Sequence, residues 1–169
     1  MHVSIKRRKR KISVCEAQGE EIKSNCAKMG EYMEIKKTEN GIVVTPDQAS
    51  IEVVASYVEE TLEKSEVAMR DSYKINIALD ELYSNIVRYS GASEAKVNCV
   101  VDEHTVMLWL QDNGIPFDPT AKGDADMEQL AEEEQIGGRG IFLVKKLMSE
   151  VTYCYENGYN ELTVKLQRM

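Results

Sequence analysis

The spacing of apolar residues changes at Gly91 of this chain, and that change limits the folds that the chain can adopt. Before Gly91, two segments carry apolar side chains every three or four residues, the spacing that gives an α-helix one buried stripe. After Gly91, four segments alternate apolar and polar residues, as half-buried β-strands do. The sequence therefore predicts helices packed against a sheet.

The helices have recognisable ends. The first is expected to begin at Thr45-Pro46-Asp47-Gln48, with threonine as the cap, proline in the first helical position and glutamine completing a capping box. The second is expected to end at Ser90-Gly91, and a third to run from about Arg139 to Ser149. The two apolar stripes are Ile51, Val54, Ala55, Val58 and Leu62, then Ile75, Ala78, Leu79, Leu82 and Ile86.

Three short turns pair the strands. Hairpins are expected around Glu39-Asn40-Gly41, Asp102-Glu103-His104 and Asn157-Gly158. The order of elements predicts an α+β fold, a two-layer sandwich whose mostly antiparallel sheet carries helices on one face. We assign this domain to residues 32–169 and a basic, loosely ordered N-terminal extension to residues 1–31.

Charge and composition exclude several classes. The formal net charge is -8, and the basic run Lys6–Lys11 leaves -14 on the rest, which argues against nucleic-acid binding by the domain itself. The basic run is either a solvated arm or a contact for RNA, DNA or anionic lipid. No apolar run approaches the roughly 18 residues that span a bilayer, and none follows the basic run as in a secretory signal. We therefore expect a cytoplasmic location.

Metal-binding spacing is lacking. The four cysteines are scattered without a C-x-x-C pair and the two histidines lie far apart, which argues against a zinc site and for reduced thiols. They are Cys15, Cys26, Cys99, Cys154, His2 and His104.

The second helix carries a carboxylate and an amide on one side. Glu81 and Asn85 are four residues apart, so both project beside the apolar stripe. An amide oxygen suits a magnesium–phosphate site, and a carboxylate can accept a proton from a hydroxyl. An exposed Glu/Asn pair without a ligand fits the same spacing.

Two glycine-containing segments follow. Asp112-Asn113-Gly114 comes directly after a strand, where the carboxylate can accept a hydrogen bond from a buried amine and glycine permits close approach. An ordinary Asp-Asn-Gly turn is the alternative. Gly137-Gly138-Arg139-Gly140 precedes the last helix, where free N–H groups and the helix N-terminus favour phosphate, with a glycine hinge as the alternative.

Taken in order, the three segments resemble the boxes of the GHKL ATPase superfamily over about residues 40–168. Glu81 and Asn85 resemble its N box, Asp112 and Gly114 its first glycine box, and Gly138 and Gly140 its second. The irregular, acidic stretch between the glycine boxes would be the ATP lid. The segments Asp-Asn-Gly-Ile-Pro-Phe-Asp-Pro and Gly-Gly-Arg-Gly-Ile-Phe-Leu-Val resemble the anti-sigma factor serine/threonine kinases in particular. Neither histidine suits the phospho-accepting role of a sensor kinase.

The resemblance implies an ATP- and Mg²⁺-dependent kinase that phosphorylates a small STAS-type antagonist, sequesters a sigma factor, or does both. Asp112 and Gly114 would hold adenine, Asn85 the magnesium ion, and Gly138, Arg139 and Gly140 the phosphates. Glu81 would be the catalytic base. Relatives of this kind commonly form homodimers. The alternatives are a nucleotide-dependent protein-binding regulator without phosphotransfer, and a structural domain with accidental boxes.

Overall fold

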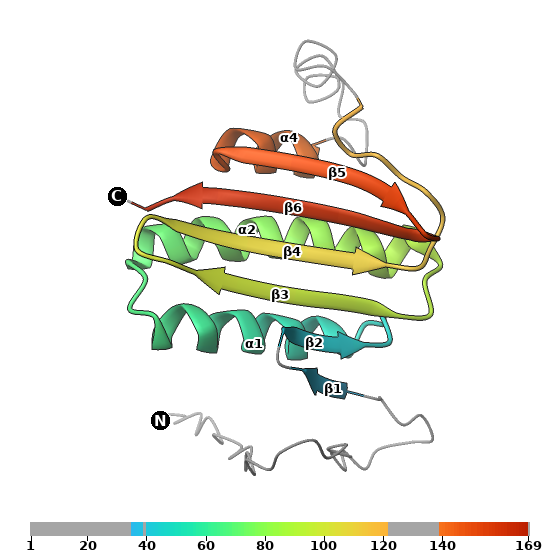
Figure 1. The fold of residues 1–169 in the computed structure, drawn as a ribbon, viewed down its shortest axis with the longest axis horizontal. Helices are drawn as coiled ribbons and strands as arrows, with labels where there is room; N and C mark the ends of the chain where they lie inside the picture. Colours follow the sequence, from blue (N-terminus) through green and yellow to red (C-terminus); the bar gives the residue numbers. More distant parts are fainter. Residues whose placement is uncertain (1–34, 39, 122–138, 169) are drawn as a thin grey trace, which may run out of the picture.

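The computed structural model describes residues 35–38, 40–121 and 139–168, so the expected extension over residues 1–31 lies outside the described residues. Within these ranges, six strands form one sheet in the order β1-β2-β3-β4-β6-β5, with every neighbouring pair antiparallel (Figure 1). The strands are β1 (Ile35–Thr38), β2 (Gly41–Val44), β3 (Ala95–Val101), β4 (Thr105–Asp112), β5 (Glu150–Glu156) and β6 (Tyr159–Gln167).

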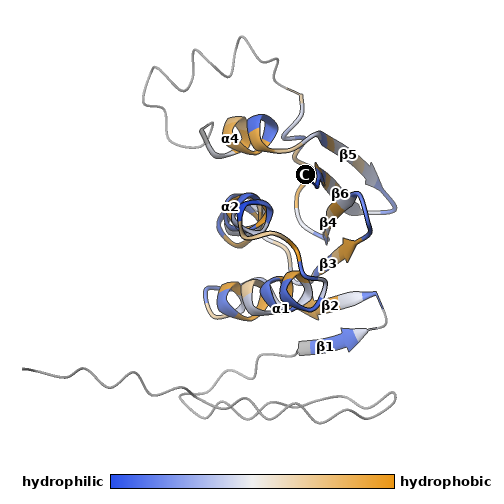
Figure 2. Cartoon of the chain, turned by 90° about the vertical axis from the view of Figure 1, so that its left-hand side faces the viewer, coloured by the Kyte–Doolittle hydropathy of each residue, from blue (hydrophilic) through white to orange (hydrophobic). Residues whose placement is uncertain are grey.

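The described helices all cover one face of this sheet, as the edge-on view in Figure 2 shows. They are α1 (Ser50–Lys64), α2 (Met69–Asn85) and α4 (Arg139–Leu147). Their buried side chains meet the inner face of the sheet in a single core. The predicted α+β two-layer sandwich is therefore confirmed, and the described part of its sheet is antiparallel throughout.

The core follows the predicted periodicity. In α1 the buried apolar residues are spaced by four, and in α2 they recur every three or four residues. In β4 every second residue is buried, from Val106 through Leu108 and Leu110 to Asp112. Burying each such valine or leucine contributes about 1.5–3 kcal/mol. Cys99 of β3 belongs to this core, and burial raises the pKa of its thiol to about 12.

The predicted start of the first helix is wrong. Helix α1 begins at Ser50, five residues after Thr45. Asp47 provides the cap, since its Oδ1 accepts the backbone N–H of Ser50 at 2.7 Å while the Ser50 hydroxyl accepts the N–H of Asp47 at 3.0 Å. This reciprocal pair has the logic of a capping box, shifted two residues along the chain.

The end of the second helix contains an unpredicted feature. Helix α2 continues into η1 (Ile86–Ser90), a π-helical turn, and Gly91 then closes it with a left-handed φ of 63°. The expected end at Ser90-Gly91 is confirmed, whereas the wider turn before it has no signature in the sequence. Such turns occur frequently at functional sites.

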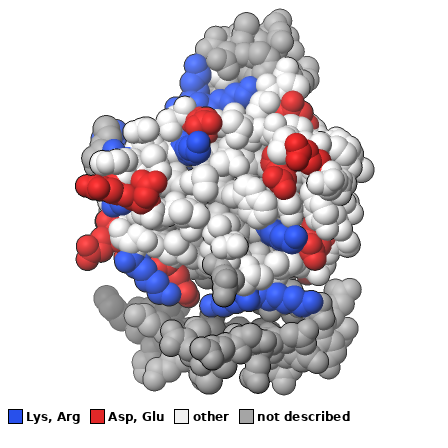
Figure 3. Space-filling view, viewed as in Figure 1, with Lys and Arg blue, Asp and Glu red and all other residues white. Residues whose placement is uncertain are grey.

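The predicted hairpins are present. The β5–β6 turn has left-handed φ values at both Asn157 (53°) and Gly158 (85°), as a two-residue type I′ hairpin requires. The outer face of the sheet, seen in Figure 3, has no described helix over it and shows a broad uncharged area among scattered charges. Among the described residues, no helix has both the length and the apolar character needed to cross a membrane.

Candidate functional site

Asp112 is a buried carboxylate at the end of the central strand β4. It continues the inward alternation of that strand and is only 6% exposed. Its Oδ1 accepts hydrogen bonds from the Gly114 N–H at 2.9 Å and from Asn160 Nδ2 at 3.2 Å. Its Oδ2 has no hydrogen-bond partner among the described residues. One oxygen is therefore fixed by the protein, and the other can accept a donor from a ligand.

Gly114 lies where the loop after β4 touches the end of the second helix. A Cβ atom there would overlap the carbonyl oxygen of Ser90 and would lie 2.7 Å from both Ser90 Cβ and Asp112 Oδ1. The next residue, Ile115, donates its N–H to the same Ser90 carbonyl at 2.9 Å. Glycine is thus required by this close approach, which η1 creates by delivering Ser90 to the loop.

Glu81 and Gly140 lie in direct contact although they belong to α2 and α4. A Cβ atom on Gly140 would overlap the Glu81 carboxylate, with Glu81 Cδ only 2.7 Å away. The carboxylate therefore stands at the first turn of α4, the positive end of that helix. The structure thus brings together one member of the predicted N box and one of the predicted second glycine box.

Asn85 is the last residue of α2, one turn beyond Glu81. Its amide makes no hydrogen bond with the part of the chain that the structure describes. Gly138 lies outside the described residues, as does the side chain of Arg139, whose backbone begins α4. The ligand roles expected of these three residues stay predictions.

Within the described ranges, no group of three or more His, Cys, Asp or Glu side chains is placed to hold a metal ion. Magnesium at a nucleotide site commonly uses one or two protein oxygens, phosphate oxygens and water. A single amide oxygen from Asn85 fits that pattern only with a phosphate present.

Asn160 of β6 is a member of the site that the sequence analysis missed. It is 6% exposed, and its side chain contacts Asp112 and the following loop through both its oxygen and its nitrogen. Burial raises the pKa of Tyr153, so this hydroxyl stays protonated and donates to Asn160 Oδ1 at 2.8 Å. One sequence signal was available: Asn160 continues the alternating series of Leu162, Val164 and Leu166 in β6, so its side chain should face the core.

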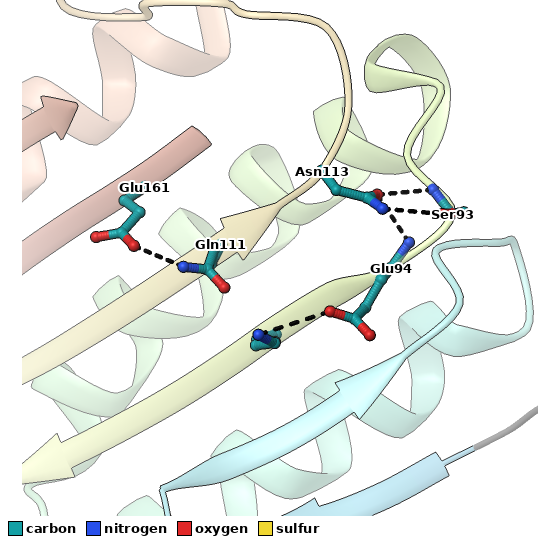
Figure 4. A network of polar contacts seen from close by, with 6 residues as sticks. Ser93, Glu94, Gln111, Asn113 and Glu161 are labelled. Carbon is teal, nitrogen blue, oxygen red and sulfur yellow. Dashed lines mark hydrogen bonds and ion pairs between the residues drawn. The ribbon is translucent and has the colours of Figure 1, made fainter. Parts of the chain in front are cut away.

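Asn113 has a structural role beside the site (Figure 4). Its Oδ1 accepts the N–H groups of Ser93 at 2.9 Å and Glu94 at 3.0 Å, and its Nδ2 donates to Ser93 Oγ at 2.9 Å. The side chain therefore ties the end of β4 to the loop before β3. The alternative reading of Asp-Asn-Gly as a turn has support in the hydrogen bond from the Gly114 N–H to Asp112 Oδ1, and Asp112 is at the same time buried.

Comparison with known proteins connects this geometry to a family. The profile of the histidine kinase-like ATPase domain matches residues 44–166, more than half of the chain. The chain is 26% identical over 108 residues to the Serine/threonine-protein kinase BtrW of Bordetella bronchiseptica, covering 58% of this chain and 76% of that protein. It is 29% identical over 99 residues to the Serine-protein kinase RsbW of Listeria monocytogenes, covering 54% of this chain and 63%, less than two thirds, of that protein.

Among solved structures, the SiaB-SiaC complex from Pseudomonas aeruginosa aligns with a TM-score of 0.49 at 15% identity, covering 79% of this chain and 90% of that one. The family match contains every described residue of the candidate site, from Glu81 to Asn160. The chain belongs to the histidine kinase-like ATPase domain family.

Proposed function

We propose that this protein is an ATP- and Mg²⁺-dependent serine/threonine kinase of the anti-sigma factor type. The observation that carries the proposal is the buried Asp112 carboxylate, which keeps one oxygen unengaged by the described residues. Beside it lies Gly114, at a position where no side chain fits. A planar base with an exocyclic amine matches this arrangement, because the amine can donate to Oδ2 while the ring passes close to the Gly114 backbone.

The phosphate end of the nucleotide is assigned to the start of α4. Gly140 lies in its first turn, where unpaired N–H groups and the helix dipole favour phosphate. Asn85 offers an amide oxygen for Mg²⁺, and Gly138 and Arg139 complete the proposed set. ATP supplies the transferable phosphoryl group, and Mg²⁺ neutralises charge on its oxygens.

Glu81 is the proposed base. Its carboxylate lies against Gly140 at the start of α4, the region assigned to the phosphates, so a serine or threonine hydroxyl presented there can pass its proton to the carboxylate. A positioned base of this kind contributes about 10²- to 10⁴-fold to the rate.

The proposed substrate is a small STAS-type antagonist protein, and the proposal includes sequestration of a sigma factor. The protein's net charge is -8, and a phosphate adds about -1.5 to -2 to the partner. Phosphorylation would therefore weaken docking through like-charge repulsion. A homodimer is part of the proposal, with the uncharged outer sheet face as its candidate surface (Figure 3).

Calorimetric titration with ATP and Mg²⁺ tests the nucleotide site. Wild-type protein is expected to bind ATP, and Asp112→Asn to bind it at least tenfold more weakly. The asparagine side chain has one acceptor oxygen, so if that oxygen keeps the contacts of Oδ1, its NH2 group faces the adenine amine. Asp102→Asn is the matched control, since Asp102 is an exposed carboxylate in the β3–β4 turn at the other end of the strand. Equal affinities of all three proteins, or no binding by wild type, would contradict the proposed site.

Glu81→Gln separates transfer from binding. The variant is expected to retain ATP affinity within about threefold and to lose phosphorylation of a STAS-domain protein by 10²-fold or more, measured with γ-labelled ATP. If Glu81→Gln phosphorylates the substrate at the wild-type rate, Glu81 is not the catalytic base. Binding without transfer by wild type, with STAS-domain proteins as substrates, would favour the regulator that transfers no phosphate.

A further inference from the structure

Helix α2 carries a second row of apolar side chains, on the side that faces away from the sheet. Met69 is 88% exposed and Tyr73 67%, and Ile77 continues the row at the same spacing of four residues. Ile77 lies two positions from both Ile75 and Leu79, which belong to the core, and two residues of a helix turn it by about 200°. Its side chain therefore points away from the core. No described helix or strand covers this side of α2 (Figure 2).

This row, which we call the α2 ridge, leads to the proposed base. The next residue at the same spacing is Glu81, whose carboxylate lies against Gly140 of α4. Each step of four residues turns about 40° further around the helix, so the ridge winds towards α4 as it approaches Glu81. From Met69 to Glu81 it extends about 18 Å, at a rise of about 1.5 Å per residue. Scattered exposed apolar residues are ordinary, whereas a continuous row that ends at the proposed base indicates a contact surface.

Helix α4 lies beside α2 and extends this surface. Leu143 follows Gly140 by three residues, so it shares the side of α4 that meets α2, and it is 40% exposed. Helix α2 leads through η1 into β3 and α4 leads into β5, and these two strands start at opposite ends of the sheet. The two helices therefore run in opposite directions. The last turn of α4, with Lys146, lies at the end of the layer where α2 begins.

The charges beside the ridge are basic, although the net charge of the protein is -8. In the first half of α2 the exposed charged residue is Arg70, since Asp71 is buried and forms an ion pair of 3.4 Å with Lys74. Helix α4 has no acidic residue and ends with Lys145 and Lys146. A partner that covers the ridge is therefore expected to present an apolar patch flanked by Asp or Glu. A second copy of the chain would place basic residues against basic residues across a two-fold interface.

We infer that the α2 ridge docks the protein substrate of the proposed kinase, an inference that rests on the proposed function. The ridge is a long convex surface, so it fits a folded protein with an acidic rim around an apolar patch. A protein that covers the ridge places its own surface next to Glu81, where the serine or threonine hydroxyl must arrive. The ridge contributes affinity for the substrate and takes no part in the chemical step. Its loss should therefore raise KM and leave kcat unchanged.

The test uses a double variant, Met69→Gln with Tyr73→Gln, and a STAS-domain protein that wild type phosphorylates with γ-labelled ATP and Mg²⁺. Both positions are exposed and glutamine suits a helix, so the double variant should fold with a Tm close to that of wild type. KM for the STAS-domain protein should rise about tenfold or more, as when interface anchors are removed. Both kcat and the ATP affinity should stay within about twofold of wild type. Lys146→Glu tests the acidic rim and should raise KM about threefold or more.

Val100→Gln is the matched control, because it removes an exposed apolar side chain from the outer face of the sheet. Its KM should stay within about twofold of wild type. If KM is unchanged in the double variant, or rises equally in Val100→Gln, the docking surface is wrong and the proposed kinase still stands. If KM is unchanged in Lys146→Glu, the partner does not have the acidic rim.

Sedimentation equilibrium tests the other occupant of the ridge, a second copy of the chain. A wild-type dimer that the double variant converts to monomers would overturn the inference, because the second copy would then cover the ridge. If wild type binds ATP but phosphorylates no STAS-domain protein, the proposed function and this inference fail together.

Discussion

Replacing Gly114 with alanine should both destabilise the protein and weaken nucleotide binding. The backbone φ at this position is not in the left-handed region, so the effect comes from the added methyl group alone. That methyl would overlap the Ser90 carbonyl oxygen and lie 2.7 Å from Asp112 Oδ1, closer than real Cβ contacts. Ser90 cannot retreat freely, because its carbonyl accepts the Ile115 N–H at 2.9 Å and its hydroxyl donates to the Ile86 carbonyl at 2.9 Å.

The size of the effect follows from overpacking against backbone. Such changes cost about 1–3 kcal/mol of the free energy of unfolding. For a domain of this size each kcal/mol lowers Tm by roughly 2–4 °C, so Gly114→Ala should unfold roughly 2–12 °C below wild type. Because the loop must shift away from Asp112, the affinity for ATP should fall by about tenfold or more.

Gly140→Ala is the matched comparison, because the atom in its way is the far end of a flexible side chain. The Glu81 carboxylate can rotate aside, and alanine favours a helix over glycine by up to about 1 kcal/mol. Its Tm should equal or exceed that of wild type, while phosphotransfer falls because Glu81 is displaced. Circular dichroism melts and ATP calorimetry on both variants give the answer. If Gly114→Ala has the Tm of wild type, or if both variants lower Tm by the same amount, the reasoning from close contacts is refuted.

Two further predictions concern residues beside the site. Burial raises the pKa of Tyr83 from 10.0 to about 12, so the unfolded chain loses this proton first and stability falls as pH rises from 10 towards 12. Tyr83→Phe should lack this part of the decline, which is about 1.4 kcal/mol of the free energy of unfolding per pH unit between these two pKa values. Denaturant titrations of both proteins at pH 9, 10 and 11 measure it. Parallel declines in wild type and variant would contradict the prediction. Asn113→Ala loses bonds to Ser93 and Glu94 and should lower the free energy of unfolding by about 1–2 kcal/mol with ATP affinity within threefold of wild type. A tenfold loss of affinity would show that Asn113 acts on the ligand.

The helices and strands with one buried face were predictable, because such a face requires apolar residues at the period of a helix or a strand. The alternation of β3, β4 and β6 and the stripe of α2 appear as expected, and the stripe of α1 does so except at Ala55, which is exposed. The start of α1 was not predictable from cap residues alone. Thr45, Asp47 and Ser50 are all acceptable caps, and the hydrogen bond between Ser50 Oγ and the Tyr83 hydroxyl, 2.7 Å long, joins residues 33 positions apart.

The contacts that assemble the site could not be predicted either, because they also join residues far apart in the sequence. Glu81 meets Gly140 and Ser90 meets Gly114 only after the helices have packed on the sheet. The η1 turn that delivers Ser90 also lacks a sequence signature. Motif order indicated which residues belong together, whereas their pairing required the fold.

The register of the sheet connects core formation to site formation. Leu110, Leu108 and Val106 of β4 pair with Leu162, Val164 and Leu166 of β6, and one step further along the same inward series Asp112 pairs with Asn160. A slip of one residue would turn every one of these side chains to the outer face. The apolar pairs therefore hold the register that places an amide donor on the carboxylate. A polar residue in phase with buried apolar neighbours is tolerated only when it finds a partner, so two such residues at the same end of paired strands are a sequence signal for a site of this kind.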